Sequence, residues 1–387
     1  RPFDATQRQK VMTAVTKASD RASYHQYLSP IEEVVEDARN GRMFILVDAE
    51  ERENEGELVI PAQMATPDAI NFMAKHGRGL ICLALTSERT NQLRLELMSR
   101  SNRSRHSTAF TVSIEAREGI STGISAHDRS HTVSVAIDPT KDYRDVMTPG
   151  HVFPLLAKDG GVLVRAGHTE AAVDIARLAG LNPAGVICEV MNDDGTMARL
   201  PDLVSFAQDH DLKIATIADL IAYRLRYDHL VKQVAKTTLD SAIGGPFDAK
   251  VYATTVDPAE HIALVKGDVS SGSPVLVRVH AMNTLDDLLA SGGKRETPLH
   301  KAMDIVGREG RGVIVLIRES RPNAISVRLN QSGNGQSKPR LLEYGIGAQI
   351  LLDLGVREMV LLSNSPARKI VGLEGYGLKV AGQRGLE

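Results

Sequence analysis

The amino-acid sequence predicts an α+β protein built from two domains. In residues 29–224, apolar strand-like runs and helical patterns follow one another in mixed order, which is typical of a mixed sheet sandwiched between helices. The tract 225–241 is polar and loosely patterned, and we interpret it as a linker. Residues 242–387 contain further strand-like runs and are predicted to form a smaller α/β domain. Residues 1–28 are polar and weakly patterned, so we expect a flexible N-terminal segment.

Caps and apolar spacing predict the helices of the first domain. Ser29-Pro30-Ile31-Glu32 has the pattern of a capping box with proline at the first helical position, and Gly41 ends that helix. Thr66-Pro67-Asp68 starts a second helix, which Gly77 stops. Later helical patterns occupy Thr169–Leu178, Pro201–His210 and Ile217–Arg224.

Short apolar runs bounded by turn residues predict the strands. In the first domain they are Met43–Val47, Leu80–Leu85, Phe110–Ile114, Val162–Val164 and Val186–Val190. In the second domain they are Val275–Val279, Val313–Ile317 and Met359–Leu362. Between the last two lies Gln331–Ser337, whose small polar residues predict a mobile loop.

The overall composition excludes several classes of partner. A formal net charge of −2 gives no reason to expect nucleic acid or an anionic membrane as a partner. No uncharged apolar stretch is long enough to span a bilayer. The chain has two cysteines, Cys82 and Cys188, both in apolar runs, so we expect buried thiols and neither a disulfide framework nor a cysteine-rich zinc site. Such cysteine usage fits a cytoplasmic protein.

The segment Asp48–Glu57 is the strongest indication of chemistry. Six of its ten residues are carboxylates, and it follows an apolar run that predicts a buried strand. A cluster of hard oxygen ligands at a strand end suits Mg²⁺ or Mn²⁺ and a polyhydroxylated substrate. A solvated acidic loop is the alternative interpretation of the segment taken alone.

A second candidate site is Arg165-Ala166-Gly167-His168-Thr169, at a predicted strand-to-helix turn. A glycine and a helix N-terminus place backbone N–H groups where an anion can bind, and Arg165 adds a cation. This combination suits the phosphate of a sugar phosphate. Thr169 is alternatively a simple N-cap, and His168 is alternatively a structural histidine.

Two further residues are candidates for proton transfer. His151 lies between Pro149 and Pro154, which hold the backbone stiffly around the imidazole. Glu189 lies inside an apolar strand, where burial would raise the pKa of its carboxyl toward the useful range. A backbone-bonded loop histidine and a solvent-facing strand glutamate are the alternatives. The segment Gly119–Ser125 supplies small hydroxyl and N–H donors for a substrate loop.

Residues from about 30 to 224 resemble the 3,4-dihydroxy-2-butanone 4-phosphate synthase family. The resemblance rests on motifs in the family's order: Asp48 with Arg52–Gly56, Gly77–Cys82, Arg117–Gly119 with Thr122–Ser125, Pro149–Pro154 and Arg165–Glu170.

The resemblance implies an activity and a site. The family converts ribulose 5-phosphate to 3,4-dihydroxy-2-butanone 4-phosphate and formate with a divalent metal, Mg²⁺ or Mn²⁺, in homodimers whose sites form at the interface. Its metal ligands correspond to Glu53 and His168, and its proton-transfer residues correspond to His151 and Glu189. Its substrate contacts fall on the following residues: Arg52, Glu53, Glu57, Arg165, Ala166, Gly167, His168, Thr169 and Glu189. Asp48, Glu55, Cys82 and Thr122 are further candidate site residues to which we assign no role. At Glu57 the family usually has aspartate, so the extra methylene changes the fit.

The second half resembles the GTP cyclohydrolase II family in Arg278–His280, Tyr344–Leu351 and Gly372–Gly377. The family's three zinc-binding cysteines are missing from Ala281–Met303, so no zinc is expected. Its nucleotide loop and its catalytic Asp-x-Arg are replaced by Glu319-Ser320-Arg321-Pro322 and Arg340-Leu341-Leu342.

Three hypotheses follow from the sequence. The leading one is a metal-dependent lyase on ribulose 5-phosphate with an inactive second domain that serves packing, dimerisation or regulation. The second is a bifunctional enzyme that also hydrolyses GTP. The third is a non-catalytic regulatory subunit, against which the costly polar clusters argue.

Overall fold

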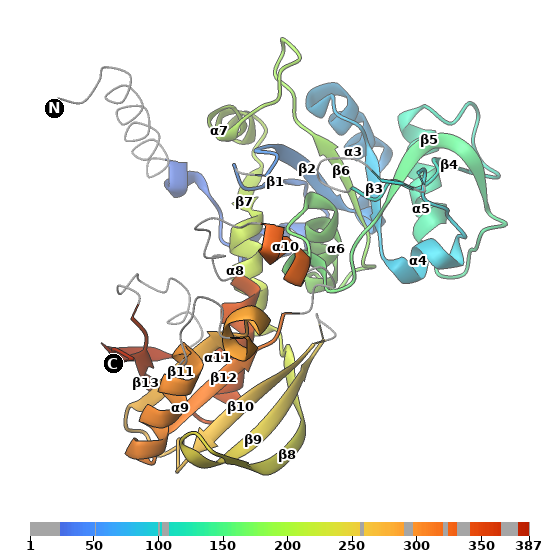
Figure 1. Cartoon of the computed structure of the whole chain (residues 1–387). Helices are drawn as coiled ribbons and strands as arrows, with labels where there is room; N and C mark the ends of the chain where they lie inside the picture. Colours follow the sequence, from blue (N-terminus) through green and yellow to red (C-terminus); the bar gives the residue numbers. More distant parts are fainter. Residues whose placement is uncertain are drawn as a thin grey trace. The chain divides into compact units, whose positions relative to one another are not determined.

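The computed structural model describes residues 24–50, 52–99, 101–102, 108–255, 259–289, 297–319, 324–330, 341–364 and 378–386. Figure 1 traces the chain through two units. The boundary between the two compact units falls between Tyr223 and Arg224.

Seven strands among the described residues form the sheet of the first unit, in the order β4-β5-β3-β6-β2-β1-β7. They are β1 (Phe44–Val47), β2 (Gly56–Pro61), β3 (Cys82–Leu85), β4 (Ile114–Ala116), β5 (Val146–Leu156), β6 (Gly185–Glu189) and β7 (Lys213–Thr216). The pairs β1–β7 and β3–β5 are parallel and the other pairs are antiparallel, so the sheet is mixed.

Helices cover both faces of this sheet (Figure 1). They are α2 (Ile31–Arg39), α3 (Pro67–Phe72), α4 (Ser87–Gln92), α5 (Ala126–Ile137), α6 (His168–Leu178), α7 (Leu200–Asp209) and α8 (Ile217–Tyr227). Short helical turns are η1 (His25–Tyr27), η2 (Ala62–Met64), η3 (Met73–Gly77) and η4 (Gly161–Leu163). Apolar side chains of α3, α5 and α7 pack on one face, and those of α2, α6 and α8 pack on the other. The unit is therefore the predicted sandwich of a mixed sheet between helical layers.

Several predicted elements of the first unit are confirmed, because their local signals are strong. All four residues of β1 are buried, as expected for a continuous apolar run covered on both faces. At α3, the Thr66 side chain accepts a hydrogen bond from Ala69 N (3.3 Å), and Pro67 occupies the first turn.

Other predictions for this unit are wrong. Val162–Val164 is not a strand, because η4 occupies it; Gly160 and Gly161 have positive φ, and the Asp174 carboxylate accepts a hydrogen bond from Val162 N (2.8 Å). In Phe110–Ile114 only isolated bridges form, and β4 begins at Ile114. Helix α2 has Pro30 at its N-cap without a side-chain hydrogen bond, so the expected capping box does not form.

The second unit has a sheet of seven described strands in the order β14-β13-β11-β12-β10-β9-β8. They are β8 (Val231–Ser241), β9 (Gly245–Thr254), β10 (Glu260–Lys266), β11 (Val275–Ala281), β12 (Gly312–Ile317), β13 (Glu358–Leu362) and β14 (Lys379–Arg384). Its helical elements are η5 (Thr284–Leu288), α9 (Pro298–Glu309), α10 (Ala324–Asn330) and α11 (Leu341–Asp353). The side chains of α11 pack on one face of the sheet, and those of α9 pack on the other.

The tract 225–241 differs from the expected linker. Helix α8 continues to Tyr227, and β8 occupies Val231–Ser241 at the sheet edge. Almost all of β8 is exposed, which explains its polar, loosely patterned sequence. The predicted loop Gln331–Ser337 lies outside the described residues.

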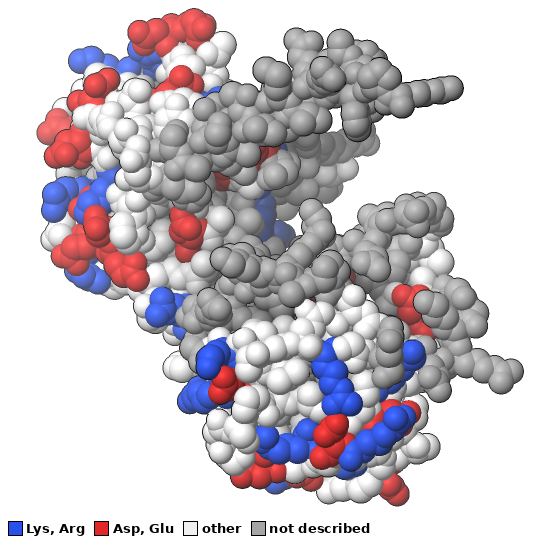
Figure 2. Space-filling view, turned by 90° about the vertical axis from the view of Figure 1, so that its left-hand side faces the viewer, with Lys and Arg blue, Asp and Glu red and all other residues white. Residues whose placement is uncertain are grey.

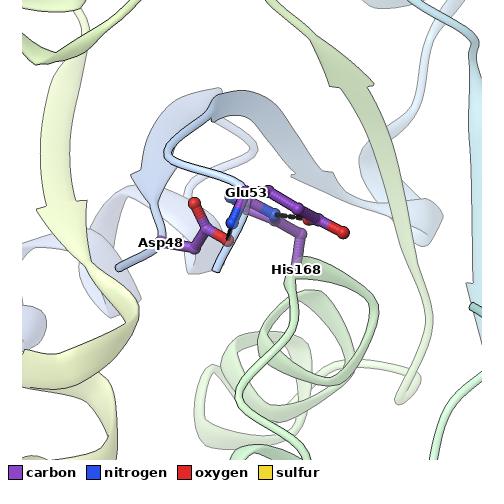
Figure 3. Close-up of side chains that lie close together, drawn as sticks. All are labelled: Asp48, Glu53 and His168. Atoms are coloured by element: carbon purple, nitrogen blue, oxygen red, sulfur yellow. Dashed lines mark hydrogen bonds and ion pairs between the residues drawn. The ribbon is translucent and has the colours of Figure 1, made fainter. Parts of the chain in front are cut away.

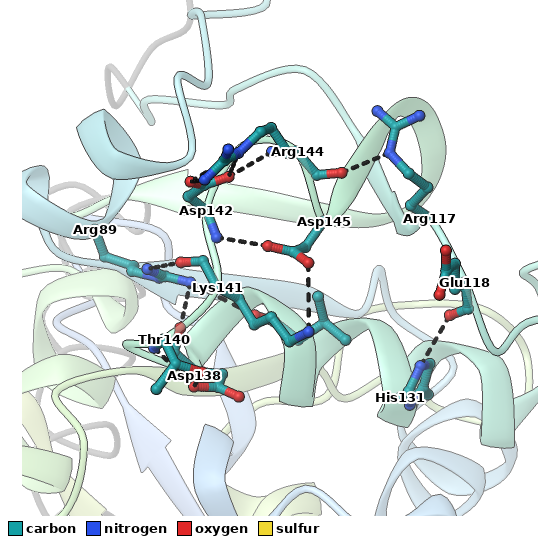
Figure 4. Close-up of polar contacts among 11 residues, drawn as sticks. Arg89, Arg117, Glu118, His131, Asp138, Thr140, Lys141, Asp142, Arg144 and Asp145 are labelled. Atoms are coloured by element: carbon teal, nitrogen blue, oxygen red, sulfur yellow. Dashed lines mark hydrogen bonds and ion pairs between the residues drawn. The ribbon is translucent and has the colours of Figure 1, made fainter.

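A polar network ties the C-terminal end of α5 to the chain leading into β5 (Figure 4). The buried Arg89 guanidinium donates to the carbonyls of Ala136 (2.6 Å), Asp138 (2.8 Å) and Lys141 (3.0 Å). These bonds satisfy carbonyls that a helix end leaves without partners. The network fixes the segment that leads into β5, the strand that carries His151.

The surface carries charges of both signs. Figure 2 shows one face on which acidic and basic side chains are interspersed over the described residues. Among the described helices, none combines the length and apolar character that crossing a bilayer requires.

Candidate active site

The acidic segment forms the connection between β1 and β2, and Asp48 organises it. The buried Asp48 carboxylate accepts hydrogen bonds from Arg52 Nη1 (2.8 Å), Glu53 N (3.1 Å) and Glu55 N (2.9 Å). Asn54 has a positive φ of 57°, which turns the chain back toward β2. The loop is therefore wrapped around one buried carboxylate. Glu51, between these residues, lies outside the described residues.

His168 reaches this loop from the first turn of α6. Its Nε2 lies 3.2 Å from the Leu46 carbonyl oxygen. A carbonyl oxygen can only accept a hydrogen bond, so we assign the ring proton to Nε2, which donates it. The Nδ1 lone pair then faces the acids, 3.1 Å from Glu57 Oε1 and 3.9 Å from Glu53 Oε2. Burial lowers the pKa of His168 to about 4, although the neighbouring acids oppose the shift. A neutral imidazole held through its second nitrogen is the form that binds metals.

Glu53, His168 and Asp48 form a group with the geometry of a metal site (Figure 3). One ligand atom from each lies within 4.8 Å of the others. Within the described part of the chain, His168 Nδ1 and Glu57 Oε2 are buried polar atoms without a hydrogen-bond partner. Burial, then Glu189 and Glu53, raise the pKa of Glu57 well above its usual value. A divalent cation between Glu53 and His168 would give His168 Nδ1 a partner and relieve the repulsion between the acids, so these residues fit a cation such as Mg²⁺.

Glu189 extends the same cluster along the sheet. It pairs with Glu57 across β2 and β6, so the two side chains project from the same face. Its Oε2 accepts a hydrogen bond from Leu80 N (2.8 Å). A Cβ atom at Gly79 would lie 2.4 Å from that oxygen, so the glycine leaves room for the carboxylate. Glu189 is thus anchored by the backbone of Leu80, against the alternative of a freely solvated side chain.

The segment Arg165–Thr169 precedes and opens α6. Arg165 Nη1 donates to Glu170 Oε2 (2.6 Å), and Nη2 donates to Thr108 Oγ1 (3.1 Å). Gly167 is the N-cap residue, so Thr169 lies inside the first turn and the N-cap interpretation is wrong. A Cβ atom at Gly167 would lie 2.3 Å from Arg165 Nη1, so this glycine leaves room for the guanidinium. Ala166 lies between Arg165 and Gly167 in the sequence.

His151 lies on the same row of the sheet but not in the acid cluster. Phe153, Cys82 and Ile187 pair across β5, β3 and β6, so His151 and Glu189 project to the same face two strands apart, about 10 Å between backbones. The His151 side chain is 46% exposed, and its Nδ1 contacts the Glu115 carboxylate. Within the described chain, His151 therefore lies apart from the metal cluster.

The remaining candidates have different surroundings. Glu55 is half-buried, and burial followed by Glu53 raises its pKa. Cys82 is buried in β3, and burial raises the pKa of its thiol. Thr122 is exposed, in a loop held by Asp128, whose carboxylate accepts bonds from the flanking residues on both sides.

Two residues in contact with the predicted site were missed. Glu115 contacts His151, and Arg199 contacts the backbone of the acidic loop. Neither belongs to a local motif around its contact, since 36 and 146 residues separate the partners. Only knowledge of the strand pairing would have found them.

In the second unit, His280, from the motif that resembles GTP cyclohydrolase II, is paired with a carboxylate. His280 Nε2 lies 2.9 Å from Asp287 Oδ2, and both side chains are buried. Asn283 N also donates to that carboxylate oxygen (2.8 Å). Arg321, Pro322, Arg340 and Gly372–Gly377 lie outside the described residues.

Comparison with known proteins follows the division into two units. The model of the family described as 3,4-dihydroxy-2-butanone 4-phosphate synthase matches residues 32–223, and that of GTP cyclohydrolase II matches residues 232–385. The chain is 50% identical over 368 residues to the riboflavin biosynthesis protein RibBA of Aquifex aeolicus, covering 90% of each chain.

Two solved structures are similar as well. One is RibBX from A. baumannii, described as a two-domain 3,4-dihydroxy-2-butanone 4-phosphate synthase; the TM-score is 0.78 at 42% identity, covering 92% of this chain and 99% of that one. The other is a 3,4-dihydroxy-2-butanone 4-phosphate synthase in complex with two magnesium ions, with a TM-score of 0.51 at 39% identity, covering 52% of this chain and 99% of that one.

Proposed function

The chain belongs to the 3,4-dihydroxy-2-butanone 4-phosphate synthase family, and from this premise we propose that it converts D-ribulose 5-phosphate to 3,4-dihydroxy-2-butanone 4-phosphate and formate. Its first unit is a lyase of riboflavin biosynthesis. The atoms of the proposed substrate equal those of the two products, so the reaction needs neither an oxidant nor a reductant. The observation that carries the proposal is the cluster of the half-buried Glu53 with the buried His168 and Asp48.

Glu53 and His168 are the proposed ligands of Mg²⁺ or Mn²⁺. Bound there, the cation would act as a Lewis acid toward neighbouring hydroxyl and carbonyl oxygens of a sugar. The Leu46 carbonyl keeps the His168 Nδ1 lone pair aimed at the cluster, and Asp48 holds the loop that carries Glu53. Both ligands are therefore in place before any substrate binds, which lowers the cost of reorganisation.

Glu189 and His151 are the proposed proton-transfer residues. Enediol formation from a ketose needs a base, and the later dehydration and migration need protons moved at other carbons. Glu189 is held by Leu80 N beside Glu57, on the face that carries the metal cluster. The contact with Glu115 orients the His151 ring and favours a proton on Nδ1, which leaves Nε2 free as a base.

Arg52 and Glu57 are proposed to contact the hydroxyls of the substrate, and the segment Arg165–Thr169 is proposed to bind its phosphate. Arg165 supplies the charge, and the first turn of α6 supplies N–H groups and the positive end of the helix dipole. Glu170 is buried beside Arg165 and holds the guanidinium toward the helix N-terminus. Thr169 and Glu170 are buried, whereas Ala166 is exposed, so the segment can be reached from solvent on the side of Ala166.

We also propose a homodimer that completes the site. Exposed apolar side chains lie near His151 in the sequence or beside a residue that contacts it: Met147 on β5, and Ile124, which follows Gly123. A second protomer covering this region would remove His151 and its neighbours from solvent. Light scattering with size exclusion tests this; a monomer with full activity would contradict it.

The second unit is proposed to lack GTP cyclohydrolase II activity. Its sequence has no cysteine, and His280 is already paired with a buried carboxylate. RibBX, whose chain is matched over 99% of its length, is described as a two-domain 3,4-dihydroxy-2-butanone 4-phosphate synthase. A bifunctional enzyme is the competing proposal, and the match to a GTP cyclohydrolase II family model favours it.

One pair of assays decides among these functions. Formate release from ribulose 5-phosphate with Mg²⁺ is expected for the wild type, and no formate is expected from GTP with Zn²⁺. Glu53→Gln and His151→Asn should each abolish release, whereas the exposed Glu36→Gln on α2 should not. Formate from GTP would establish the bifunctional enzyme, and no formate from either substrate would leave the regulatory subunit.

A further inference from the structure

Arg199 lies beside the acidic loop and near the end of β6, yet it belongs to none of the predicted motifs. After β6 the chain makes a short excursion and returns, so that Ala198 N donates to Val190 O (3.0 Å). Val190 N in turn donates to Gly56 O (3.0 Å), at the start of β2. Arg199 is thereby held beside the strand end that carries Glu189, and it serves as the N-cap residue of α7.

The Arg199 side chain contacts the acidic loop from outside. Its Nη1 donates to the carbonyl oxygens of Glu53 (3.0 Å) and Asn54. The left-handed conformation of Asn54 turns these carbonyls away from Asp48, which accepts N–H groups on the inner side of the loop. The loop is therefore held from within by a carboxylate and from without by a guanidinium.

Helix α7 adds an apolar contact at the end of the same loop. A Cβ atom at Gly56 would lie 2.3 Å from Leu203 Cδ1, so the leucine packs directly on the glycine backbone. Leu203 N donates to Arg199 O (2.8 Å), which places the two side chains one turn apart on the helix. One rigid helical turn thus contacts both the middle and the end of the metal-binding loop.

We propose that Arg199 is a positioning residue that holds the Glu53 carboxylate at its metal-binding position by fixing the backbone carbonyls of Glu53 and Asn54. This inference rests on the proposed function, because it assigns Glu53 to the metal. Without Arg199, the outward-facing carbonyls of Glu53 and Asn54 would accept hydrogen bonds from water or other donors in turn. Each change of hydrogen-bond partner would rotate the Glu53 peptide.

The test is Mn²⁺ binding to the full chain, followed by electron paramagnetic resonance without substrate. Arg199→Met removes the donors and keeps the length of the side chain, Arg199→Gln keeps a neutral donor, and Arg199→Lys keeps the charge. Arg39→Met on α2 is the control, because Arg39 also donates to a backbone carbonyl and pairs with an acid, away from the loop.

Arg199→Met is expected to weaken Mn²⁺ binding about 10- to 100-fold, as removal of outer-shell partners does. Arg199→Lys should recover most of the affinity and Arg199→Gln part of it, while the control binds as the wild type does. Steady-state assays should show a raised Mg²⁺ requirement for Arg199→Met, with kcat partly restored at high Mg²⁺.

Two results would overturn the inference. One is a folded Arg199→Met protein that binds Mn²⁺ as tightly as the wild type. The other is a loss of Mn²⁺ affinity that parallels the loss of melting temperature in all three Arg199 variants. That result would show that Arg199 is purely structural. If Arg199→Met does not fold, the lysine and glutamine variants still give this comparison. Mn²⁺ binding by a wild type that releases no formate would count against the proposed function and leave Arg199 supported.

Discussion

Asp48→Asn is the change that isolates the organisation of the metal-binding loop. Asparagine has nearly the same shape as aspartate, so packing is conserved while the charge is removed. The three donors around Asp48 contact both of its oxygens: Glu55 N at Oδ1, and Glu53 N and Arg52 Nη1 at Oδ2. Whichever way the amide is turned, its NH₂ group faces at least one N–H donor.

The magnitude follows from these contacts. A hydrogen bond to a charged group contributes about 1.5–3 kcal/mol and a neutral one about 0.5–1.5 kcal/mol, and a buried donor left without an acceptor costs about 1–3 kcal/mol. The lower desolvation cost of a neutral amide offsets part of this sum. We expect a net loss of about 2–4 kcal/mol in the free energy of unfolding, which lowers the melting temperature of a unit of this size by about 4–15 °C.

Calorimetry of the metal-free protein measures the shift, and Mn²⁺ titration measures the accompanying loss of affinity. Asp138→Asn is the matched control, because within the described part of the chain that carboxylate accepts its hydrogen bonds from Thr140, in a surface turn. The control should change stability by less than about 1 kcal/mol. If Asp48→Asn has the same melting temperature as the Asp138→Asn control and binds Mn²⁺ as tightly as the wild type, the described hydrogen bonds do not organise the loop.

Three further predictions concern the same unit. Gly79→Ala places a Cβ atom 2.4 Å from Glu189 Oε2 and should lower kcat about 10- to 100-fold through overpacking. Gly382→Ala is the control and should leave kcat unchanged, because no atom lies within 4 Å of the added Cβ. Equal kcat values for the two variants would contradict the described position of the Glu189 carboxylate. Burial raises the pKa of Cys188 to about 12 and raises that of the other cysteine too, so neither thiol should react with a disulfide reagent at pH 8 until the protein is denatured. Folding lowers the pKa of His168 from 6.5 to about 4, so the unfolded state binds more protons at this histidine below pH 6.5. The raised pKa of Glu57 has the opposite effect, so the test uses a Glu57→Gln variant: its metal-free stability should fall as the pH drops from about 6.5 toward 4, and a constant melting temperature would contradict this.

Much of the fold could be predicted wherever a local signal decided the conformation. The run Phe44–Val47 is apolar at every position and is buried at every position. The Thr66 cap and Pro67 fix the start of α3. The fold class, a mixed sheet with helices on both faces and a second smaller domain, followed from the order of such elements.

The errors arose where pairing or glycine geometry overrode the local pattern. Val162–Val164 has strand composition, but the two preceding positive-φ glycines and Asp174 stabilise a helical turn instead. β5 contains two prolines, which conceal a strand from propensity arguments, and the edge strand β8 is too exposed to alternate between apolar and polar residues.

The candidate site shows the same division. Asp48, Glu53 and His168 lie close together, although His168 comes from a distant segment of the sequence. Glu115 and Arg199 act across strands and helices that are distant in the sequence, so their contacts depend on the register of the sheet. No periodicity within either segment encodes that register.

The most direct test of the proposed metal site is a crystal structure with Mn²⁺ and its anomalous scattering map. We expect a peak within about 2.0–2.3 Å of a Glu53 carboxylate oxygen and of His168 Nδ1. A well-occupied peak that contacts neither side chain would contradict the proposed site.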